Sequence, residues 1–300
     1  MKVLIVGLGS IAQKHIDSLL QLLGNLEIFA LRRSESKIDY DGIINIYELE
    51  GDFDFAIVSN PTSEHAFTIS NLLKLKIPLF IEKPLFGELK YDKLIETINF
   101  YDIKTYIACN LRFLDSINYL KSHIDGKRIN EINIYCGSYL PEWRPNVNFR
   151  DIYSAQKELG GGVHIDLIHE IDYVVYLFGF PNLIHKTFRS NSSLDISAYD
   201  YANYLFEYDG FCVNIILNYY RRSPKRSIEI VCEDGEYRAD LLKNKVFWNE
   251  EVVFSSNQKI SDTYLPQMKY FLENIIKNSS TKSLNNINEA YNILKLCLED

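Results

Sequence analysis

Hydrophobic positions in the first third of the chain form short apolar runs that alternate with stretches long enough to be helices. A helix is expected after the first run, ending at about Leu23. Strands interleaved with helix-length segments form a parallel sheet joined by right-handed crossovers, so this region predicts an α/β domain. The predicted strands are 3–6, 28–31, 55–58, 79–81 and 106–108.

After about Tyr119 the pattern changes to longer apolar stretches that follow one another through polar turns, such as Tyr208-Asp209-Gly210. Turn signals between neighbouring strands are typical of an antiparallel sheet. One helix, 163–178, interrupts this region, and two more, 265–276 and 288–298, close the chain. The predicted strands are 129–135, 201–206, 211–219, 227–231 and 236–241.

Composition narrows the class of protein. A chain of 300 residues predicts two domains of about 150 residues each. A formal charge of −8 argues against a nucleic-acid partner, which would favour a basic surface. The N-terminal run lacks a signal-peptide pattern and no run approaches the ~20 apolar residues of a membrane span, so we expect a cytoplasmic protein with no membrane partner. The scattered cysteines predict neither a disulfide framework nor a metal site.

A glycine motif, Gly7-Leu8-Gly9-Ser10-Ile11-Ala12, follows the first predicted strand and opens the first predicted helix. Gly7 permits a tight turn, Gly9 lets backbone approach a pyrophosphate, and the small Ala12 lets helix and strand pack closely. The helix N-terminus, with Ser10 and Ile11, offers free N–H groups to phosphates. This context favours dinucleotide binding over a glycine turn that binds nothing.

The end of the second predicted strand bears on the choice of cofactor. An acidic residue is expected there when the adenosine ribose carries a free 2′-hydroxyl, but the chain continues with Arg32-Arg33-Ser34. Guanidinium groups and a hydroxyl suit a 2′-phosphate, so the sequence favours NADP, with NAD still possible. The alternative is that these arginines are simply solvated at a strand end.

Two further segments carry candidate chemistry. Glu82-Lys83-Pro84 follows the strand 79–81, and a lysine at the carboxyl end of a parallel strand faces the ligand crevice. Later, a glycine run, 160–162, opens the helix on which Asp166 and His169 stand three residues apart and so share a face. Taken alone, that pair could be an ordinary helix-surface contact.

Together these segments resemble the glucose–fructose oxidoreductase / inositol dehydrogenase / rhizopine-catabolism (Gfo/Idh/MocA) family. The matching pieces are 7–12 with His15, Asn60-Pro61-Thr62 with His65, Glu82-Lys83-Pro84, Asn110-Leu111-Arg112-Phe113, and the glycine-rich helix.

The resemblance implies a fold and a reaction. It implies a Rossmann dinucleotide-binding domain, 1–118, and an α+β domain, 119–300, built on an open, mainly antiparallel sheet that binds substrate and mediates a homo-dimer or homo-tetramer. The implied reaction is hydride transfer between nicotinamide and a ring carbon of a sugar, cyclitol or related compound. The expected cofactor-binding residues beyond the glycine motif and the arginines are Asn60, Pro61, His65, Glu82 and Lys83.

The glycine-rich helix departs from the family pattern G-G-G-x-x-x-D-x-x-x-H-x-x-D, because Asp166 and His169 are one residue closer. Counting forward from the glycines still matches Asp166 to the aspartate of the pattern, and counting back from Asp172 matches His169 to its histidine. By resemblance, we expect His169 to be the general acid/base, Asp166 to orient it, and Lys83 to donate to the reacting oxygen. The roles of Lys83 and His169 could be reversed.

Arginines and aromatic residues gather in the second predicted domain of this acidic chain. Arginines bind phosphate or carboxylate, and aromatic rings stack on sugars or bases, so we predict an anionic, carboxylated or nucleotide-linked sugar. A solvated strand end or a subunit contact at 221–226 is the alternative. The expected substrate-binding residues are Tyr139, Trp143, Arg144, Tyr153 and Arg221 of this group, together with Asn110 and Arg112 of the family motif.

Two other functions fit parts of this pattern. A non-catalytic dinucleotide-binding sensor or partner protein could keep this fold, but the presence of Lys83, Asp166 and His169 together disfavours it. A reductase of linear substrates is disfavoured by the glycine-rich helix.

Overall fold

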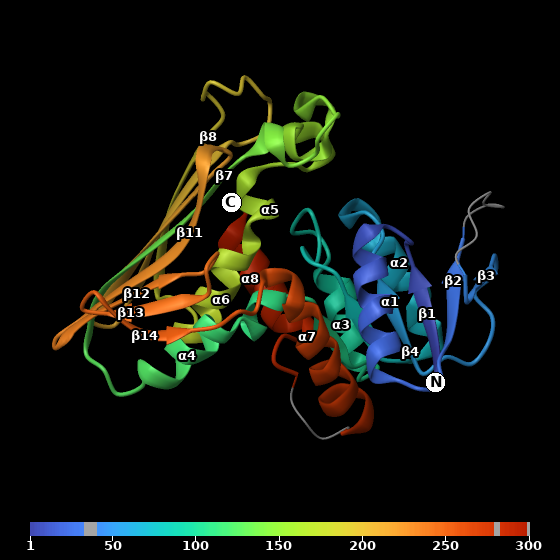
Figure 1. The fold of residues 1–300 in the computed structure, drawn as a ribbon. Coiled ribbons are helices and arrows are strands. Elements are labelled where there is room, and N and C mark those ends of the chain that lie inside the picture. Colours follow the sequence, from blue (N-terminus) through green and yellow to red (C-terminus); the bar gives the residue numbers. More distant parts are fainter. Residues whose placement is uncertain (33–40, 279–282, 299–300) are drawn as a thin grey trace. The chain divides into compact units, whose positions relative to one another are not determined.

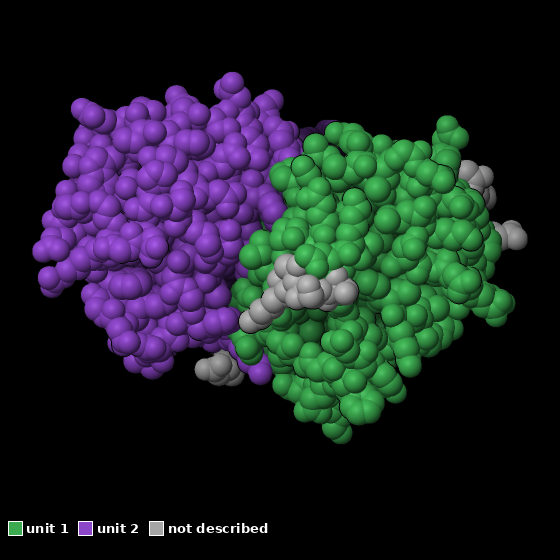
Figure 2. Space-filling model, turned by 90° about the horizontal axis from the view of Figure 1, so that it is seen from below, with its two compact units in different colours: residues 1–110, 264–294 green, residues 111–263, 295–300 purple. Residues whose placement is uncertain are grey.

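The computed structural model describes residues 1–32, 41–278 and 283–298. These form two compact units (Figure 2): unit 1 is Met1–Asn110 with Tyr264–Leu294, and unit 2 is Leu111–Thr263 with Lys295–Asp300. The predicted second domain began at residue 119 and included the C-terminal helices. In the structure most of that C-terminal segment groups with unit 1, because helix α7, Tyr264–Phe271, packs on helix α1, Ser10–Leu22.

Unit 1 is built on a six-stranded parallel sheet in the order β3-β2-β1-β4-β5-β6. The central strand β4 is buried along its whole length, as expected for a sheet covered on both faces. This confirms the predicted Rossmann sheet and adds β3. The strands are β1 Lys2–Val6, β2 Glu27–Leu31, β3 Ile43–Ile46, β4 Phe55–Val58, β5 Leu79–Ile81 and β6 Thr105–Ile107.

The helices of unit 1 pack on this sheet through apolar faces. Helix α1 buries Ala12, Ile16 and Leu19, which recur at helical spacing. A wider π-helical turn, Leu272–Lys277, follows α7. The helices are α1 Ser10–Leu22, α2 His65–Leu72, α3 Asp92–Phe100, α7 Tyr264–Phe271 and α8 Ile287–Cys297, whose last turn is counted with unit 2.

Unit 2 is built on an eight-stranded sheet in the order β14-β13-β12-β11-β7-β10-β9-β8. Among the described strands of this sheet, only β7 and β10 pair in parallel, so the predicted mainly antiparallel sheet is confirmed. Strands β8, β13 and β14 were not predicted. The strands are β7 Ile129–Tyr139, β8 Leu183–Arg189, β9 Tyr201–Tyr208, β10 Phe211–Asn218, β11 Tyr220–Cys232, β12 Gly235–Asp240, β13 Lys245–Trp248 and β14 Glu251–Ser255.

Three helices of unit 2 lie against one face of this sheet (Figure 1): α4 Asp115–His123, α5 Val163–Asp166 and α6 Ile168–Phe178. The prediction of one continuous helix over 163–178 was wrong. Leu167, with φ −99° and ψ 29°, breaks it into the single turn α5 and the longer α6. Asp166 and His169 therefore lie on either side of a break, and the spacing rule for one helix face does not apply to them.

Side chains on β7 and β11 alternate between the helix-covered face and the opposite face. Ile132, Ile134 and Cys136 are buried, and Arg226, which pairs with Cys136 across the strands, reaches Glu170 of α6. Tyr135 and Lys225 therefore lie on the opposite face.

No helix among the described residues is long and apolar enough to cross a bilayer.

Candidate active site

The turn after β1 requires glycine at one position and leaves open space at another. Gly7 has φ +98°, and a Cβ there would lie 2.4 Å from the backbone nitrogen of Asn60. The Ser59 hydroxyl donates to the carbonyl oxygen of Gly7 at 2.8 Å, which joins the ends of β1 and β4. A Cβ at Gly9, by contrast, would meet nothing within 4 Å. Gly9 is the N-cap of α1, so open space adjoins the N-terminus of this helix, and this cradle fits a pyrophosphate.

A pocket of about 490 Å³ adjoins this turn in unit 1. Arg32 lies on its wall, and its backbone N–H donates to the carbonyl oxygen of Ile46 at 2.8 Å, which fixes the end of β2. Tyr47 and Phe67 also line the pocket, and Phe67 is 70% exposed. This shape and lining fit an adenosine moiety. Arg33 and Ser34, the other residues of the predicted phosphate contact, lie outside the described residues.

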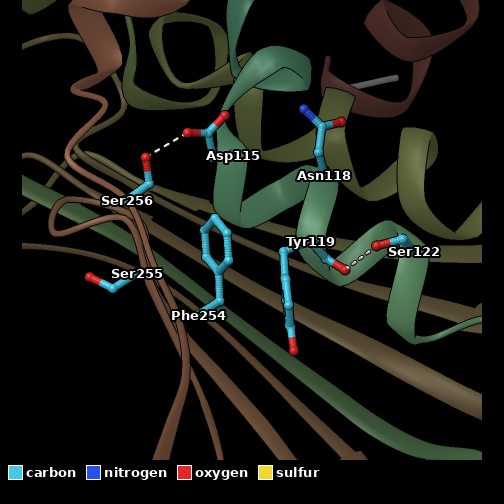
Figure 3. A pocket seen from close by; sticks show the side chains of 7 residues that line it. All are labelled: Asp115, Asn118, Tyr119, Ser122, Phe254, Ser255 and Ser256. Atoms are coloured by element: carbon cyan, nitrogen blue, oxygen red, sulfur yellow. Dashed lines mark hydrogen bonds between the residues drawn. The ribbon is translucent and has the colours of Figure 1, made fainter.

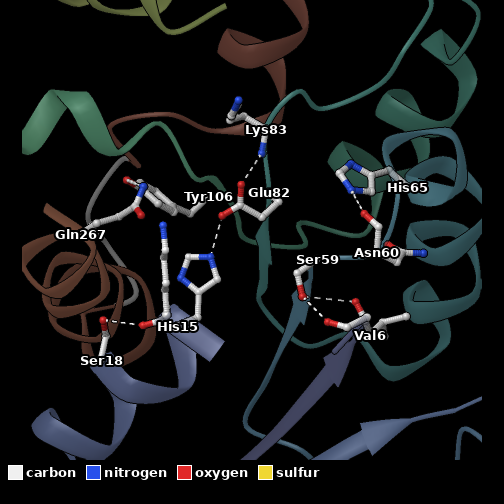
Figure 4. A network of polar contacts seen from close by, with 12 residues as sticks. Val6, His15, Ser18, Ser59, Asn60, His65, Glu82, Lys83, Tyr106 and Gln267 are labelled. Carbon is white, nitrogen blue, oxygen red and sulfur yellow. Dashed lines mark hydrogen bonds and ion pairs between the residues drawn. The ribbon is translucent and has the colours of Figure 1, made fainter. Parts of the chain in front are cut away.

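The segment after β4 is held by its own polar side chains (Figure 4). The Asn60 amide donates to the Thr68 hydroxyl at 2.8 Å, which places Pro61 and the start of α2. The buried His65 ring lies between the carbonyl oxygens of Asn60 and Leu85, at 3.0 and 3.1 Å. Burial lowers the pKa of His65, while these two carbonyls oppose the shift. His65 therefore links the strand ends of β4 and β5.

Lys83 follows β5 in the same sheet (Figure 4). The buried His15 ring contacts Oε1 of Glu82 through Nε2 at 2.6 Å, and Oε2 of Glu82 accepts the backbone N–H of Lys83 at 3.2 Å. His15 on α1 therefore fixes the turn that presents Lys83. The sequence marked both His15 and Glu82, but it did not show that they form a pair.

In unit 2, Asp166 is the centre of a compact polar cluster. It is 7% exposed, and its Oδ2 accepts the Tyr219 hydroxyl at 2.5 Å. Its Oδ1 accepts the Tyr153 hydroxyl in a short hydrogen bond. Trp143 packs edge-on against Tyr219, with ring centroids 5.2 Å apart. Burial, and then the Asp166 charge, raise the pKa of Tyr153, and the nearby Arg144 opposes that shift.

The glycine run 160–162 makes this cluster possible. A Cβ at Gly161 would lie 1.9 Å from the carbonyl oxygen of Tyr153, so only glycine lets the loop approach α5. Gly162, at φ +143°, turns the chain into α5. His169 is half-buried in the first turn of α6. The structure thus brings Trp143, Arg144, Tyr153 and Asp166 together within one unit.

Other predicted substrate residues lie elsewhere. Arg112 is 2% exposed, and its Nε and Nη2 donate to the carboxylate of Asp172 at 2.9 and 2.8 Å. This buried pair gives Arg112 a partner on α6, and its expected contact with substrate stays a prediction. Asn110, at the start of the 3-10 turn Asn110–Phe113, is also buried.

Arg221 is separated from the Asp166 cluster. Its Nη1 donates to the Tyr135 hydroxyl at 3.4 Å, and its guanidinium lies over the Tyr135 ring, on the sheet face opposite α5 and α6. Arg222 similarly bonds and stacks on Tyr139. The sequence grouped Arg221 and Tyr139 with Trp143 because they are all arginine or aromatic residues, but the contact with Tyr135 places Arg221 on another surface of unit 2.

Two family models match most of the chain. Residues 1–97 match an oxidoreductase family with an NAD-binding Rossmann fold, and residues 117–238 match the GFO/IDH/MocA C-terminal domain. The chain belongs to the Gfo/Idh/MocA oxidoreductase family. No curated protein matches it in sequence.

Solved structures share the fold at low identity. UDP-N-acetylglucosamine 3-dehydrogenase GnnA from Acidithiobacillus ferrooxidans is 17% identical, with 99% of this chain and 95% of that one covered and a TM-score of 0.77. Myo-inositol 2-dehydrogenase from Lactobacillus plantarum is 17% identical, with 99% and 95% covered and a TM-score of 0.78. The WlbA dehydrogenase from Chromobacterium violaceum, in complex with NADH and UDP-GlcNAcA, is 16% identical, with 99% and 91% covered and a TM-score of 0.79.

This Gfo/Idh/MocA oxidoreductase has a second pocket, of about 480 Å³, between α4 and β14 of unit 2 (Figure 3). Tyr119 stacks on Phe254 there, and the Ser256 hydroxyl donates to Asp115 at 2.5 Å. None of the predicted site residues that the structure describes lines it.

The sequence did not indicate Tyr219 as a partner of Asp166, because the hydroxyl meets the carboxylate only once β10 and β11 are in place.

Proposed function

We propose that this oxidoreductase transfers a hydride between a nicotinamide cofactor, preferentially NADP, and a ring carbon of an anionic sugar. The observation that carries the proposal is the arrangement of strand ends in unit 1. The glycine turn, Asn60 and Lys83 follow β1, β4 and β5, which are neighbours in one parallel sheet. A phosphate cradle and a lysine therefore lie along one sheet edge, where open α/β sheets bind ligands.

The proposed chemistry gives each candidate catalytic residue its own role. A bound nicotinamide would supply or accept the hydride. Lys83, held by Glu82 and His15, donates a hydrogen bond to the reacting oxygen. His169 takes or returns the hydroxyl proton as general acid/base, and the charge of Asp166 orients it.

The substrate class rests on the cluster around Asp166. Trp143 is 37% and Tyr153 42% exposed, so both rings can stack on a sugar or a base. Arg144 lies close enough to act on the Tyr153 hydroxyl and can pair with a phosphate or carboxylate. Similar structures include a UDP-N-acetylglucosamine dehydrogenase and a complex with UDP-GlcNAcA. We therefore propose a nucleotide-linked or carboxylated sugar, processed in the cytoplasm by a homo-dimer or homo-tetramer.

A nicotinamide absorbance screen tests this function. Neutral hexoses, inositols, uronic acids and nucleotide sugars are compared with the full-length protein at low and high salt. We expect the best kcat/KM for an anionic sugar, with a KM that rises with salt because charge pairing is screened. Arg144→Ala should raise KM for that substrate only, with the exposed Arg238→Ala as its matched control. Best turnover of a neutral sugar, unaffected by Arg144→Ala, would reject the anionic class. Tight cofactor binding without turnover of any sugar would favour a sensor.

A further inference from the structure

Among the described residues of unit 2, three aspartates are buried, and their hydrogen-bond partners differ in chemistry. Asp172 accepts hydrogen bonds from the Arg112 guanidinium, and Asp200 accepts them from the hydroxyl and backbone N–H of Ser192. Asp166 receives two phenol hydroxyls, from Tyr153 and Tyr219. An ionised carboxylate that accepts hydroxyl donors makes short, charge-assisted hydrogen bonds. The surroundings of Asp166 therefore favour a carboxylate that accepts hydrogen bonds over a protonated carboxyl group that donates one.

The two phenols are fixed donors. Burial, followed by the charge of Asp166, raises the pKa of Tyr219 well above its ordinary value, and the same causes raise that of Tyr153. Both hydroxyls therefore keep their protons across the physiological range. Each carboxylate oxygen of Asp166 then has one donor that cannot be lost by ionisation.

The donors reach Asp166 from independent parts of unit 2. Tyr219 is fully buried between β10 and β11 and is packed by the edge of Trp143. Tyr153 comes from the 3-10 turn Tyr153–Ala155, whose backbone lies against Gly161. Local sequence does not create such a convergence. It has to be built by the fold, and it fixes the last residue of α5 immediately before the break at Leu167.

We propose that Tyr153 and Tyr219 are positioning residues that hold Asp166 as a fixed, ionised carboxylate, and that turnover depends on both hydroxyls. This inference rests on the proposed function, in which the charge of Asp166 supports proton transfer by His169. Tyr153 is the half-exposed member of the pair, so it also joins the substrate-facing loop to the carboxylate.

The test uses Tyr153→Phe and Tyr219→Phe, which remove only an oxygen atom. Tyr204→Phe is the matched control, because Tyr204 is also buried in unit 2 but donates to the carbonyl oxygen of Cys297 at 2.8 Å. We expect each of the first two variants to lose about 10- to 100-fold in kcat, the worth of a hydrogen bond to a charged group. KM and cofactor affinity should change less than about threefold, and the acidic limb of the kcat profile should move to higher pH. Tyr204→Phe should keep kcat and the profile.

A second measurement does not depend on activity. The carboxyl carbon of Asp166, labelled with carbon-13 and assigned with Asp166→Asn, is titrated in each protein by NMR. Its transition should move to higher pH in Tyr219→Phe and Tyr153→Phe, because the ionised form has lost a donor. An unmoved transition, or an unmoved kcat profile with kcat per folded site within about threefold of wild type, overturns the inference. If the transition moves but no sugar is turned over by the wild type, the positioning role stands and the proposed function fails.

Discussion

In unit 1, the residues that fit a dinucleotide lie within a few positions of the strand ends they follow, whereas in unit 2 the residues around Asp166 come from segments far apart in sequence. Gly7 and Gly9 directly follow β1, and Lys83 follows β5. Asp166 meets Tyr153 and Tyr219, which are 13 and 53 positions away. The first site is determined by backbone conformation and the second by packing of the whole unit.

This difference predicts how each site responds to mutation. A backbone-determined site should be sensitive to Cβ atoms and insensitive to distant side chains. A site assembled by packing should lose its geometry when a buried contact that holds its helices is removed.

Breaking the buried ion pair of Arg112 and Asp172 in unit 2 should give the largest change in stability. Asp172→Ala leaves the Arg112 guanidinium buried without its carboxylate, and we expect a loss of about 3–5 kcal/mol in the free energy of unfolding, measured by urea denaturation. The double replacement of Arg112 by Met and Asp172 by Leu should recover most of that loss. The exposed pair Lys90–Glu88 is the control, and Glu88→Ala should leave the urea midpoint unchanged. A small effect of Asp172→Ala would mean that α6 is held by other contacts.

Turnover should be lost from either site by a comparable factor. Lys83→Ala in unit 1 and His169→Ala in unit 2 should each lower kcat by about 10²-fold or more, the usual contribution of a proton-transferring group. Cofactor affinity, measured by calorimetry, should stay within a modest factor for both. The exposed Lys90→Ala and His185→Ala are matched controls and should retain wild-type kcat. A near-normal rate in His169→Ala would assign proton transfer to Lys83.

The two glycines of the first turn should separate folding from binding. Gly7→Ala should lower the free energy of unfolding by about 2 kcal/mol, because its positive φ and the contact with Asn60 exclude a Cβ. Gly9→Ala should fold with an unchanged Tm, since its Cβ meets only open space, but should weaken cofactor binding by occupying the phosphate cradle. Equal cofactor affinity in Gly9→Ala and wild type would place the phosphates elsewhere.

The same contrast explains what could be predicted from sequence. The parallel sheet of unit 1 was predicted because its buried strands are continuous apolar runs, and Gly7 was marked because its role depends on local conformation. Strands β13 and β14 were missed, since their connecting residues Asn249 and Glu250 adopt positive φ without the glycine that signals a hairpin. Strand β8 is a half-exposed edge strand with charged positions, which weakens the hydrophobic signal.

In unit 2, the sequence identified Asp166 and His169 but not their surroundings. The helix breaks at Leu167, where no glycine or proline predicts a break. The break lies beside Asp166 and its tertiary contacts. By resemblance Arg112 was expected to bind substrate, and the structure pairs it with Asp172. In the sequence, Asp172 served only to align the family motif. Contacts between distant segments have no local signature, so these partners required the structure.

Cofactor choice should give a smaller effect, confined to unit 1. Wild type should bind NADPH more tightly than NADH, because a 2′-phosphate would gain charge-assisted contacts at the end of β2. Replacing Arg32 and Arg33 with Ala should remove most of that preference, about tenfold, and leave NADH affinity unchanged when both are measured by calorimetry. Arg238→Ala, far along the chain in unit 2, is the control. Equal or tighter binding of NADH by wild type would contradict the assignment.

The smallest expected effect is a pH dependence of stability that arises at the strand ends of unit 1. Burial lowers the pKa of His65 below its ordinary value of 6.5, against the opposing influence of the Leu85 and Asn60 carbonyls and the charge of Glu82. The unfolded chain therefore binds the proton at higher pH than the folded protein does. The stability contributed by neutral His65 is fully present above about pH 6.5 and is lost as the pH falls below it, by at most ~1.4 kcal/mol per pH unit for one proton. His65→Gln should flatten the slope of unfolding free energy against pH below 6.5, measured by urea denaturation, whereas His123→Gln, at an exposed position of unit 2, should leave it unchanged. An equal slope in wild type and His65→Gln would show that the link between β4 and β5 does not depend on the neutral ring.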